Sequence, residues 1–410
     1  MRGDALRELG GVDSSAAWWR LGLAVLLSTI GGVGMWSVVV VLPAVEAEFG
    51  VARAGASLPY STTMIGFAFG GVLMGRLADR FGATVPLAVG AVALGVGYAL
   101  SAVAGTVWQF AAVHGILIGF LGTSASFSPL LADISQWFER RRGIAVAVCA
   151  SGNYVAGTVW PPVVQHFVQS IGWRQTHLGI GLFCVTTMLP LAFAMRRRPP
   201  AHRTGAPSAA RFGSGTIQGL SPKSLQALLA VAGLSCCVAM SMPQVHIVAY
   251  CGELGYGVAR GAEMLALMLG FGIVSRIASG WIADHIGGLA TLLLGSTLQG
   301  LALFLYLWFD GLTSLYVISA LFGLFQGGIV PSYALIVRQY FPPAEAGTRV
   351  GVVIMATLFG MALGGWMSGL IFDLTGVYRA AFANGLMWNL LNVAIIAWLM
   401  QRARMRTAAA

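Results

Sequence analysis

One arginine lies inside a long apolar stretch, where a charged side chain needs a chemical reason. Arg276 lies in the apolar segment 261–282 and precedes Asp284 by eight residues, so on a helix it lies roughly 12 Å inside the border that Asp284 marks, near the middle depth of the membrane. A guanidinium at that depth is costly unless it faces a cavity or a partner, and the acidic residues fall in loops or near helix ends. A carboxylate ligand would supply the partner through two parallel hydrogen bonds. The alternative is a structural arginine bonded to backbone carbonyls.

Other polar and aromatic side chains lie in similar apolar stretches and could line a cavity near this arginine. The candidates for contact with a ligand are Tyr333, Asn153, Tyr154, Phe127 and Trp366, and Trp36 could form a further apolar wall. Packing and interhelical hydrogen bonding are the ordinary alternatives for each of them. Two titratable residues could carry a proton: His114, whose side chain titrates near neutral pH, and Asp133. A packing histidine and a plain helix-end charge are the alternatives.

The elements that position these residues are predicted to be membrane-spanning helices. Of the 410 residues, 57% are hydrophobic and 9% are charged, whereas a soluble domain carries about a quarter charged residues. A spanning helix needs roughly 20 apolar residues. About twelve such stretches are expected, at 18–43, 57–78, 86–104, 108–133, 144–166, 173–195, 223–249, 261–282, 288–309, 313–338, 349–372 and 380–401. The predicted fold class is an all-α membrane protein with two six-helix bundles.

Basic residues are distributed unevenly between the two sides of these helices. With the N-terminus inside, only Arg53, Arg174, Arg260 and Arg379 face outward, Arg276 is left over, and the rest of the 24 Lys and Arg face the cytoplasm. This positive-inside pattern predicts both termini in the cytoplasm and explains the net charge of +10 without nucleic acid. The polar N-terminus predicts that the first helix is an anchor and no signal peptide.

The two halves of the sequence repeat one loop motif. Gly75–Gly82 reads GRLADRFG after the second helix, and Gly280–Gly287 reads GWIADHIG after the eighth. The basic, Pro-rich segment 196–222 is predicted to be a linker between the bundles 1–195 and 223–410. A repeat of this kind is typical of transporters that alternate access around a central site.

The repeated aspartates are candidates for a gate. Asp79, with Arg80 beside it, is expected to reach the start of the eleventh helix near Arg349. Asp284 is expected to reach the start of the fifth helix near Arg142, where a carboxylate meets the positive end of a helix. These contacts would hold the cytoplasmic side closed. A loop-structuring aspartate is the alternative.

The second and eleventh helices share one glycine spacing. Their glycines are Gly66, Gly70, Gly71 and Gly75 in one, and Gly360, Gly364, Gly365 and Gly369 in the other. Small residues four positions apart let helices approach closely. Generic packing is one interpretation, and sliding of these two helices on each other is the other.

The loop repeat and the layout of six and six helices resemble the major facilitator superfamily over essentially the whole chain. The stretch Trp137–Ala147, followed by Gly152 and Gly157, resembles the signature between helices 4 and 5 of monocarboxylate transporters and their bacterial oxalate/formate relatives. Glu48-Phe49-Gly50 with Arg53 and Ser57 is also similar to bacterial members. The chain departs from the animal members at Gly272, where they have an acidic residue, and by lacking a lysine in helix 1.

These observations predict a secondary transporter of a small organic monocarboxylate, with proton symport by alternating access. One deep cation favours one carboxylate per substrate, because a second unpaired charge would be costly in a low-dielectric cavity. An anion exchanger or uniporter for the same substrates stays open, as does, from another class, a membrane receptor or sensor. We expect no enzymatic activity, cofactor or metal, since the five cysteines lack metal-ligand spacing. The expected partners are the substrate anion, the proton and the lipid bilayer of the cytoplasmic (inner) membrane, with a monomer as the functional unit.

Overall fold

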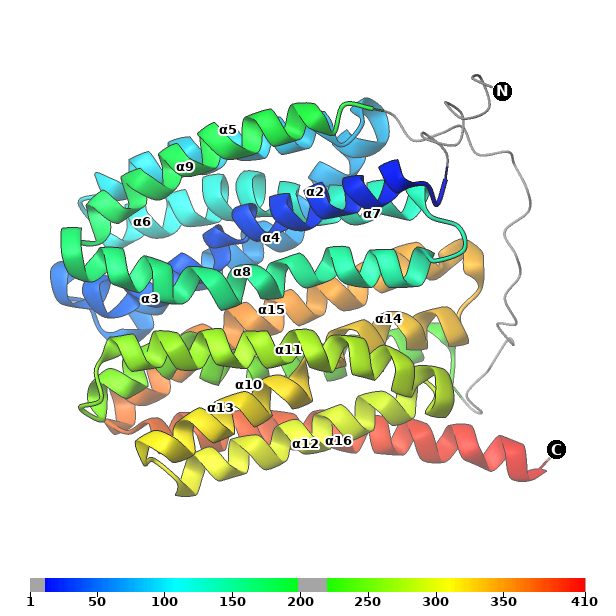
Figure 1. The fold of residues 1–410 in the computed structure, drawn as a ribbon. Helices are drawn as coiled ribbons and strands as arrows, with labels where there is room; N and C mark the ends of the chain where they lie inside the picture. Colours follow the sequence, from blue (N-terminus) through cyan, green and yellow to red (C-terminus); the bar gives the residue numbers. More distant parts are fainter. Residues whose placement is uncertain (1–11, 198–219, 410) are drawn as a thin grey trace. The chain divides into compact units, whose positions relative to one another are not determined.

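The computed structural model describes residues 12–197 and 220–409, which are helical almost throughout and contain no strand in these two ranges (Figure 1). Most of the predicted linker, 198–219, lies outside the described residues. The chain folds into two compact units. Among described residues, the first comprises 12–49 and 58–197, and the second 50–57 and 220–409.

The first unit contains six rods, of which two are interrupted. The helices are α2 (Ser15–Gly31), α3 (Val33–Phe49), α4 (Arg53–Phe81), α5 (Thr84–Ala102), α6 (Val107–Val113), η1 (His114–Gly122), η2 (Thr123–Ser126), α7 (Ser128–Trp137), α8 (Arg142–Ile171) and α9 (Trp173–Ala194). α2 and α3 form one rod that pauses at Gly32. The fourth rod changes along its length from the α-helix α6 to the π-helix η1, the 3-10 helix η2 and the α-helix α7.

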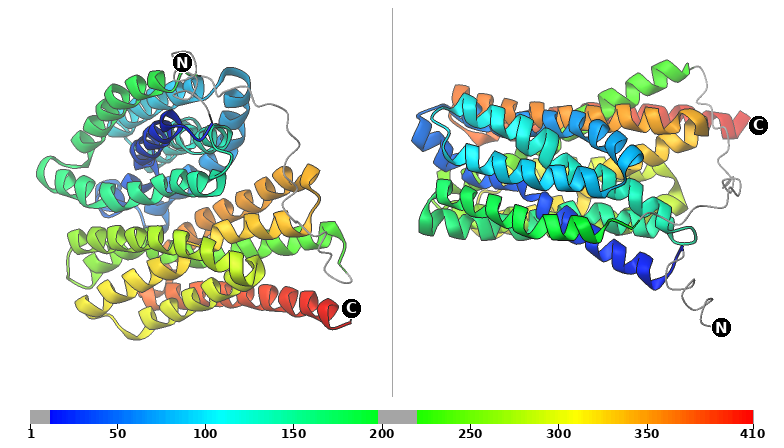
Figure 2. Two further views of the ribbon diagram at one scale, coloured as in Figure 1. Left: turned by 45° about the vertical axis from the view of Figure 1, so that its right-hand side comes forward. Right: turned by 90° about the horizontal axis from the view of Figure 1, so that it is seen from above.

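The second unit also contains six rods. Its helices are α10 (Pro222–Glu253), α11 (Val258–Ile286), α12 (Gly288–Trp308), α13 (Leu312–Gln326), α14 (Ile329–Tyr340), α15 (Pro343–Thr375) and α16 (Tyr378–Ala409). α13 and α14 form one rod that breaks at Gly327 and Gly328. α12 and α16 lie side by side (Figures 1 and 2), and α10 packs mainly on α15 and α16.

Eleven stretches among the described residues are long and apolar enough to cross a bilayer. They match the predicted segments except the second, which is α4. This helix has 29 residues, ample length for a span, but its sequence is richer in Gly, Ser, Thr and charged residues than those of the other rods. α4 completes the twelve rods, so the predicted all-α fold is confirmed.

The aromatic pair of the helix 4–5 signature fastens the first rod to the fourth. Trp137 and Phe138 end α7 and are both buried. Trp18 of α2 meets the Phe138 ring edge-on at 5.0 Å, and the Arg20 guanidinium lies 4.7 Å over the Trp137 ring. Gly152 of α8 also lets its helix approach the first rod closely, because a Cβ there would lie 2.7 Å from the Cβ of Ser28. The signature residues therefore pack around the first helix.

The shared glycine spacing is used for packing inside each unit. A Cβ on Gly66 of α4 would collide with the carbonyl oxygen of Gly115 in η1. A Cβ on Gly360 of α15 would collide with the carbonyl oxygen of Leu234 in α10. Close backbone approach within each bundle explains these glycines. The predicted sliding of α4 on α15 stays a prediction.

Candidate functional site

Arg276 lies beside the break in the fourth rod of the second unit. Its Nε donates to the carbonyl oxygen of Gly327 at 3.4 Å, and Gly327 is the first residue after α13. The centre of α11 is Gly272, so Arg276 lies about one turn, roughly 6 Å, towards the C-terminal end of that helix. The expected middle depth is thus shifted by one turn. Interrupted helices are an arrangement that transporters use to build binding sites at membrane depth.

The approach of α11 to this break is too close for side chains. A Cβ on Gly327 would collide with the carbonyl oxygen of Gly272. Gly272 is the position where animal monocarboxylate transporters have an acidic residue. Glycine at 327 lets the two backbones touch. This contact uses the backbone oxygen of Gly272 and therefore does not explain the glycine at that position.

Tyr333 and Trp366 occupy other helices of the second unit. Tyr333 is fully buried in α14, and its hydroxyl accepts a hydrogen bond from the Asn392 side-chain amide at 2.5 Å. The same amide donates to the carbonyl of Ala232 in α10 at 2.7 Å. Trp366 is half-buried in α15. The Asn392 amide therefore joins α10, α14 and α16, and a ligand at the Tyr333 hydroxyl would have to share that hydroxyl with the amide.

The second unit contains further buried amides. Gln244 of α10 donates to Gln326 of α13 at 2.7 Å, and both are buried. Neither polar atom of the Asn389 amide has a hydrogen-bond partner in the described part of the chain. A buried amide without a hydrogen-bond partner lowers the free energy of unfolding, so these polar groups reduce the stability of this unit.

The candidates of the first unit lie on three different rods. Trp36 of α3 donates its indole N–H to the Asn153 carbonyl of α8 at 3.2 Å, and the Asn153 amide contacts the Met35 sulfur at 3.7 Å. The Phe127 ring lies 5.8 Å from the Phe67 ring, at the junction between η2 and α7. Tyr154 is buried in α8. Trp36 and Asn153 are thus brought together, as a packing contact between the first and fifth rods.

His114 begins the π-helical stretch of the fourth rod and is fully buried. Its Nδ1 lies 3.0 Å from the Phe110 carbonyl and must donate to it, because a carbonyl only accepts. Its ring lies 5.8 Å from that of His177 in α9, whose Nδ1 meets the Ser101 hydroxyl at 2.8 Å. His177 was not among the predicted site residues, and a histidine within an apolar span was the signal that could have found it.

Asp133 is held in a buried ion pair with Arg20. Nε and Nη2 of Arg20 donate to its two carboxylate oxygens at 2.6 and 2.8 Å, and each side chain is only 7% exposed. The Arg20 Nη2 also donates to the carbonyl of Met195 at 2.9 Å. Arg20 was counted among the basic residues of the cytoplasmic side, and its buried pairing with Asp133 was not predicted. Both carboxylate oxygens of Asp133 accept hydrogen bonds from Arg20, so a proton on Asp133 would require the pair to open.

The sequence matches the Major Facilitator Superfamily over residues 24–318 and 289–409. The chain belongs to the Major Facilitator Superfamily. It is a multi-pass integral membrane protein and a transporter, and the resemblance predicted from the sequence is confirmed.

This facilitator has curated relatives in several kingdoms. Monocarboxylate transporter 13 of Bos taurus is 26% identical over 322 residues, covering 77% of this chain and 73% of the relative. The MFS-type transporter pynF of Aspergillus niger is 25% identical over 356 residues, covering 86% and 81%. The uncharacterized MFS-type transporter YcxA of Bacillus subtilis is 24% identical over 349 residues, covering 82% and 83%.

Solved structures share the fold of this facilitator. The nucleoside transporter NupG has a TM-score of 0.71 at 15% identity, with 94% of this chain and 99% of that chain covered. A bacterial homologue of the human lysosomal transporter Spinster, in an inward-facing and occupied conformation, has a TM-score of 0.67 at 15% identity, with 95% and 96% covered. At this identity the likeness shows the fold alone.

The predicted gate residues of the facilitator lie at helix ends. Asp79, Arg80 and Asp284 are found near the ends of α4 and α11. Arg142 donates to the Phe138 carbonyl at 3.0 Å, and Arg349 forms an ion pair with Glu345 at 2.7 Å. The predicted contacts of Asp79 with the start of α15 and of Asp284 with the start of α8 would join the two units, and they stay predictions.

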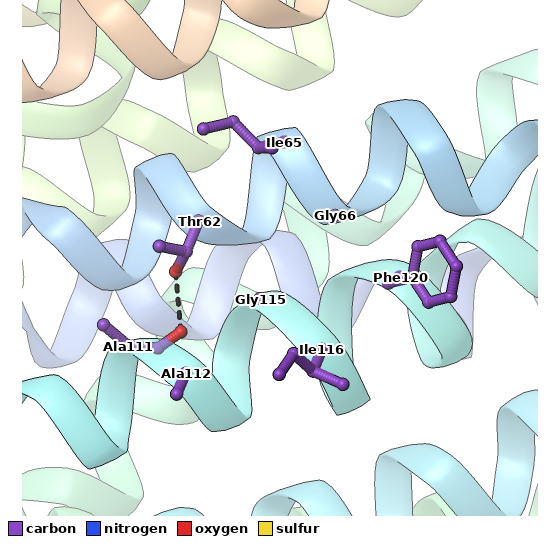
Figure 3. A pocket seen from close by; sticks show the side chains of 8 residues that line it. All are labelled: Thr62, Ile65, Gly66, Ala111, Ala112, Gly115, Ile116 and Phe120. Atoms are coloured by element: carbon purple, nitrogen blue, oxygen red, sulfur yellow. Dashed lines mark hydrogen bonds between the residues drawn. The ribbon is translucent and has the colours of Figure 1, made fainter.

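A surface pocket in the first unit differs in chemistry from a carboxylate site. It has a volume of about 270 Å³ and lies between α4 and the rod of α6 and η1 (Figure 3). Its lining is apolar apart from the Thr62 hydroxyl, which donates to the Ala111 carbonyl at 2.7 Å. Ile65 and Ile116 at its rim are exposed. Without a charged or free polar group, this pocket suits hydrocarbon and no anion.

Proposed function

We propose that this facilitator carries a small organic monocarboxylate across the cytoplasmic (inner) membrane as a proton symporter that works by alternating access. Arg276 provides the anion site. Tyr333, Asn153, Tyr154, Phe127 and Trp366 line the path of the substrate. The functional unit is the monomer, and both termini lie in the cytoplasm.

The observation that carries the proposal is the place of Arg276. Its guanidinium lies next to the broken backbone at Gly327, one turn from the centre of α11. At 3.4 Å the bond to the Gly327 carbonyl is longer than a strong charge-assisted hydrogen bond, and a two-bonded carboxylate would bind the guanidinium more strongly than this one bond does. Arginine suits this task because its planar fork matches the two oxygens of one carboxylate.

The relatives support a carboxylate as the substrate class. Several are monocarboxylate transporters at about 25% identity, and they align with most of this chain. Tail length and polarity of the substrate would be selected by the aromatic and amide side chains on the helices beside Arg276.

We propose proton coupling because a single carboxylate is negatively charged and a proton would neutralise it. A proton that travels with the carboxylate makes the complex neutral and lowers the cost of crossing the low-dielectric interior. His114 and Asp133 are the candidate carriers. His114 is neutral in its hydrogen-bonded form, with Nε2 free to accept, whereas Asp133 must first part from Arg20.

The gate is proposed to use the repeated loops. Asp79 and Asp284 would bind the helix starts that carry Arg349 and Arg142, with Arg80 beside the first, and release them when the cytoplasmic side opens. Carboxylates at helix N-termini are stabilising by roughly 0.3–1 kcal/mol each, small enough to be broken in every cycle.

The experiment that tests this function is uptake into proteoliposomes. Purified protein would be offered labelled monocarboxylates, dicarboxylates and the neutral amides of the same acids, with and without an inward proton gradient. We expect saturable uptake of one or more monocarboxylates that rises with the gradient, and no uptake of the amides. Equal uptake of acids and amides would overturn the anion site, and uptake indifferent to the gradient would overturn proton symport.

A further inference from the structure

The first turn of α4 belongs to the second unit, although the rest of this helix belongs to the first. Asp373 of α15 caps the turn: its two carboxylate oxygens accept the backbone N–H groups of Arg53 and Ala54, each at 2.8 Å. A carboxylate at this position also faces the positive end of the helix dipole. Gly369 of α15 lies so near that a Cβ would be 2.9 Å from the Arg53 carbonyl oxygen. The backbone of the turn is therefore held by α15.

The side chain of Arg53 extends the contact to two more helices. It is 6% exposed, although the sequence suggested an outward-facing surface charge. Nη2 donates to Glu253 of α10 at 2.7 Å, and Nη1 donates to the Tyr378 hydroxyl of α16 at 2.5 Å. The guanidinium also lies 4.7 Å over the Phe372 ring. We call Arg53, Glu253, Asp373 and Tyr378 the Arg53 cluster.

A buried histidine continues this cluster into the bundle. His246 of α10 is fully buried, with Nδ1 3.3 Å from the Tyr378 hydroxyl and Nε2 2.8 Å from the Gly365 carbonyl. Because a carbonyl only accepts, Nε2 carries a hydrogen, and the neutral ring then presents the Nδ1 lone pair to Tyr378. Tyr378 therefore donates to His246 and accepts from Arg53. Gly365 directly precedes Trp366, a residue of the proposed substrate path.

The charged groups of the Arg53 cluster, which contacts His246, sum to one net negative charge. The Arg53 cluster contains one cation, Arg53, and two anions, Glu253 and Asp373, so it carries a single net negative charge. The neighbouring helix ends add only compensated pairs or hydroxyls: Arg379 with Asp310 at 3.2 Å, Arg260 with Glu263 at 3.0 Å, and Tyr250. On α14, Arg338 lies in the last turn, away from the break that begins this helix. A proton on His246 would bring the group to neutrality.

We propose that His246 is a proton-binding residue that controls the hold of the second unit on the first turn of α4. The proton enters from water and binds Nδ1, and the new Nδ1–H donates to the Tyr378 oxygen. The Tyr378 hydroxyl hydrogen must then turn away, and two cationic donors, Arg53 and His246, compete for one oxygen. The Arg53 bond weakens and the turn is released. This deepens the proposed proton coupling and rests on it for its part in transport, but binding of the proton needs no substrate.

Ser57 offers a direct readout of this release. It is fully buried in the turn, and its hydroxyl donates to the Arg53 carbonyl at 2.7 Å. The five native cysteines are all buried, so a Ser57→Cys variant would provide one reporter thiol with a low background. Its labelling by a membrane-impermeant maleimide would be followed from pH 8 to pH 4 in full-length protein, because full burial disfavours the charged form of His246. A Val103→Cys variant, in an exposed loop, supplies the intrinsic pH dependence of the reaction.

We expect the labelling rate of the Ser57→Cys thiol, relative to that of the Val103→Cys thiol, to rise by about tenfold on acidification. This factor corresponds to the free energy of one charge-assisted hydrogen bond. Adding His246→Gln should abolish the rise, because glutamine cannot titrate. Adding Arg53→Ala should give fast labelling at every pH. The exposed His166 provides the matched control: His166→Gln should leave the rise unchanged.

Two results would overturn the inference: no rise on acidification in the Ser57→Cys protein, or an equal rise after His246→Gln. Uptake assays separate this failure from that of the proposed function. Proton-driven monocarboxylate uptake with pH-independent labelling would reject the role of His246 alone. A His246-dependent rise in a protein that takes up no monocarboxylate would reject the proposed substrate and leave the proton site in place.

Discussion

Arg20 and Asp133, on the first and fourth rods of the first unit, form a two-bonded ion pair that is almost wholly shielded from solvent. Breaking one partner leaves the other charge buried and alone. We expect Arg20→Ala or Asp133→Ala to cost about 3–5 kcal/mol of stability, measured as a fall in thermal denaturation temperature in detergent. The apolar pair Arg20→Met with Asp133→Leu should recover most of it.

That double variant also tests Asp133 as a proton carrier. If the aspartate carries the proton, uptake by the double variant will no longer respond to a pH gradient, and a stable protein will rule out misfolding as the cause. Gradient-driven uptake that survives in this variant and in His114→Gln would remove both residues from the proton path. The exposed pair Arg379–Asp310 is the control, and its loss should change stability little.

Arg276 is expected to bind the substrate carboxylate. Arg276→Ala should abolish binding without harming insertion, because removing a charge from the bilayer interior is not costly. Arg276→Lys keeps the charge but loses the planar fork, and should bind weakly. The loss corresponds to about 2–5 kcal/mol, or roughly 30-fold to several thousand-fold in affinity.

Equilibrium binding to monodisperse protein is the measurement for these Arg276 variants. Arg260→Ala is the matched control, since this arginine lies on the same helix but is exposed and paired with Glu263. Wild-type affinity in a well-folded Arg276→Ala protein would contradict the anion site.

Two glycines of α4, one in a crowded and one in an open position, provide a test of packing in the first unit and its control. Gly66→Ala places a Cβ against the Gly115 carbonyl and should destabilise the unit by about 1–3 kcal/mol, whereas Gly75→Ala meets nothing within 4 Å. The thermal denaturation temperature should fall for the first and stay unchanged or rise for the second. Equal effects of the two substitutions would disprove the close approach of α4 and η1.

The gate is tested by Asp79→Asn and Asp284→Asn. Each removes a carboxylate from a helix start, so we expect the cytoplasmic side to open more often and transport to slow. Thiol accessibility from the cytoplasmic side and initial uptake rates are the measurements. Unchanged values of both in each variant would refute the gate.

Topology is open to a simple labelling experiment. A cysteine or tag placed within 196–222 should react only from the cytoplasmic side, because the basic residues are concentrated there. Reagents would be applied to intact cells and to inverted vesicles. Reaction in intact cells with an impermeant reagent would reverse the proposed orientation.

The fold was predictable from sequence because lipid demands long apolar helices, and their length and number can be read directly. Interruptions were harder to predict. Thr123–Ser126 adopts a 3-10 turn and His114–Gly122 a π-helix, although both lie within one continuous apolar stretch of sequence. The Gly31-Gly32 and Gly327-Gly328 pairs carry a local signal for the breaks at α2–α3 and α13–α14.

The site was predictable only where a residue stood out from its surroundings. Arg276 did so, because it is a charge within an apolar segment. Arg20 and Arg53 did not, since an arginine at a helix end is expected to serve topology. Their partners, Asp133 and Asp373, are more than a hundred positions away in the sequence, and no local pattern connects such pairs.

The hydrogen bonds of the Asn392 amide affect how α16 inserts into the membrane. Lipid offers it no hydrogen-bond partner, and its partners, the Ala232 carbonyl and the Tyr333 hydroxyl, lie on helices that leave the ribosome earlier. α16 therefore gains by inserting against α10 and α14 rather than alone. Synthesis of the second unit should include a docking step, in which α16 joins helices that are already in the membrane.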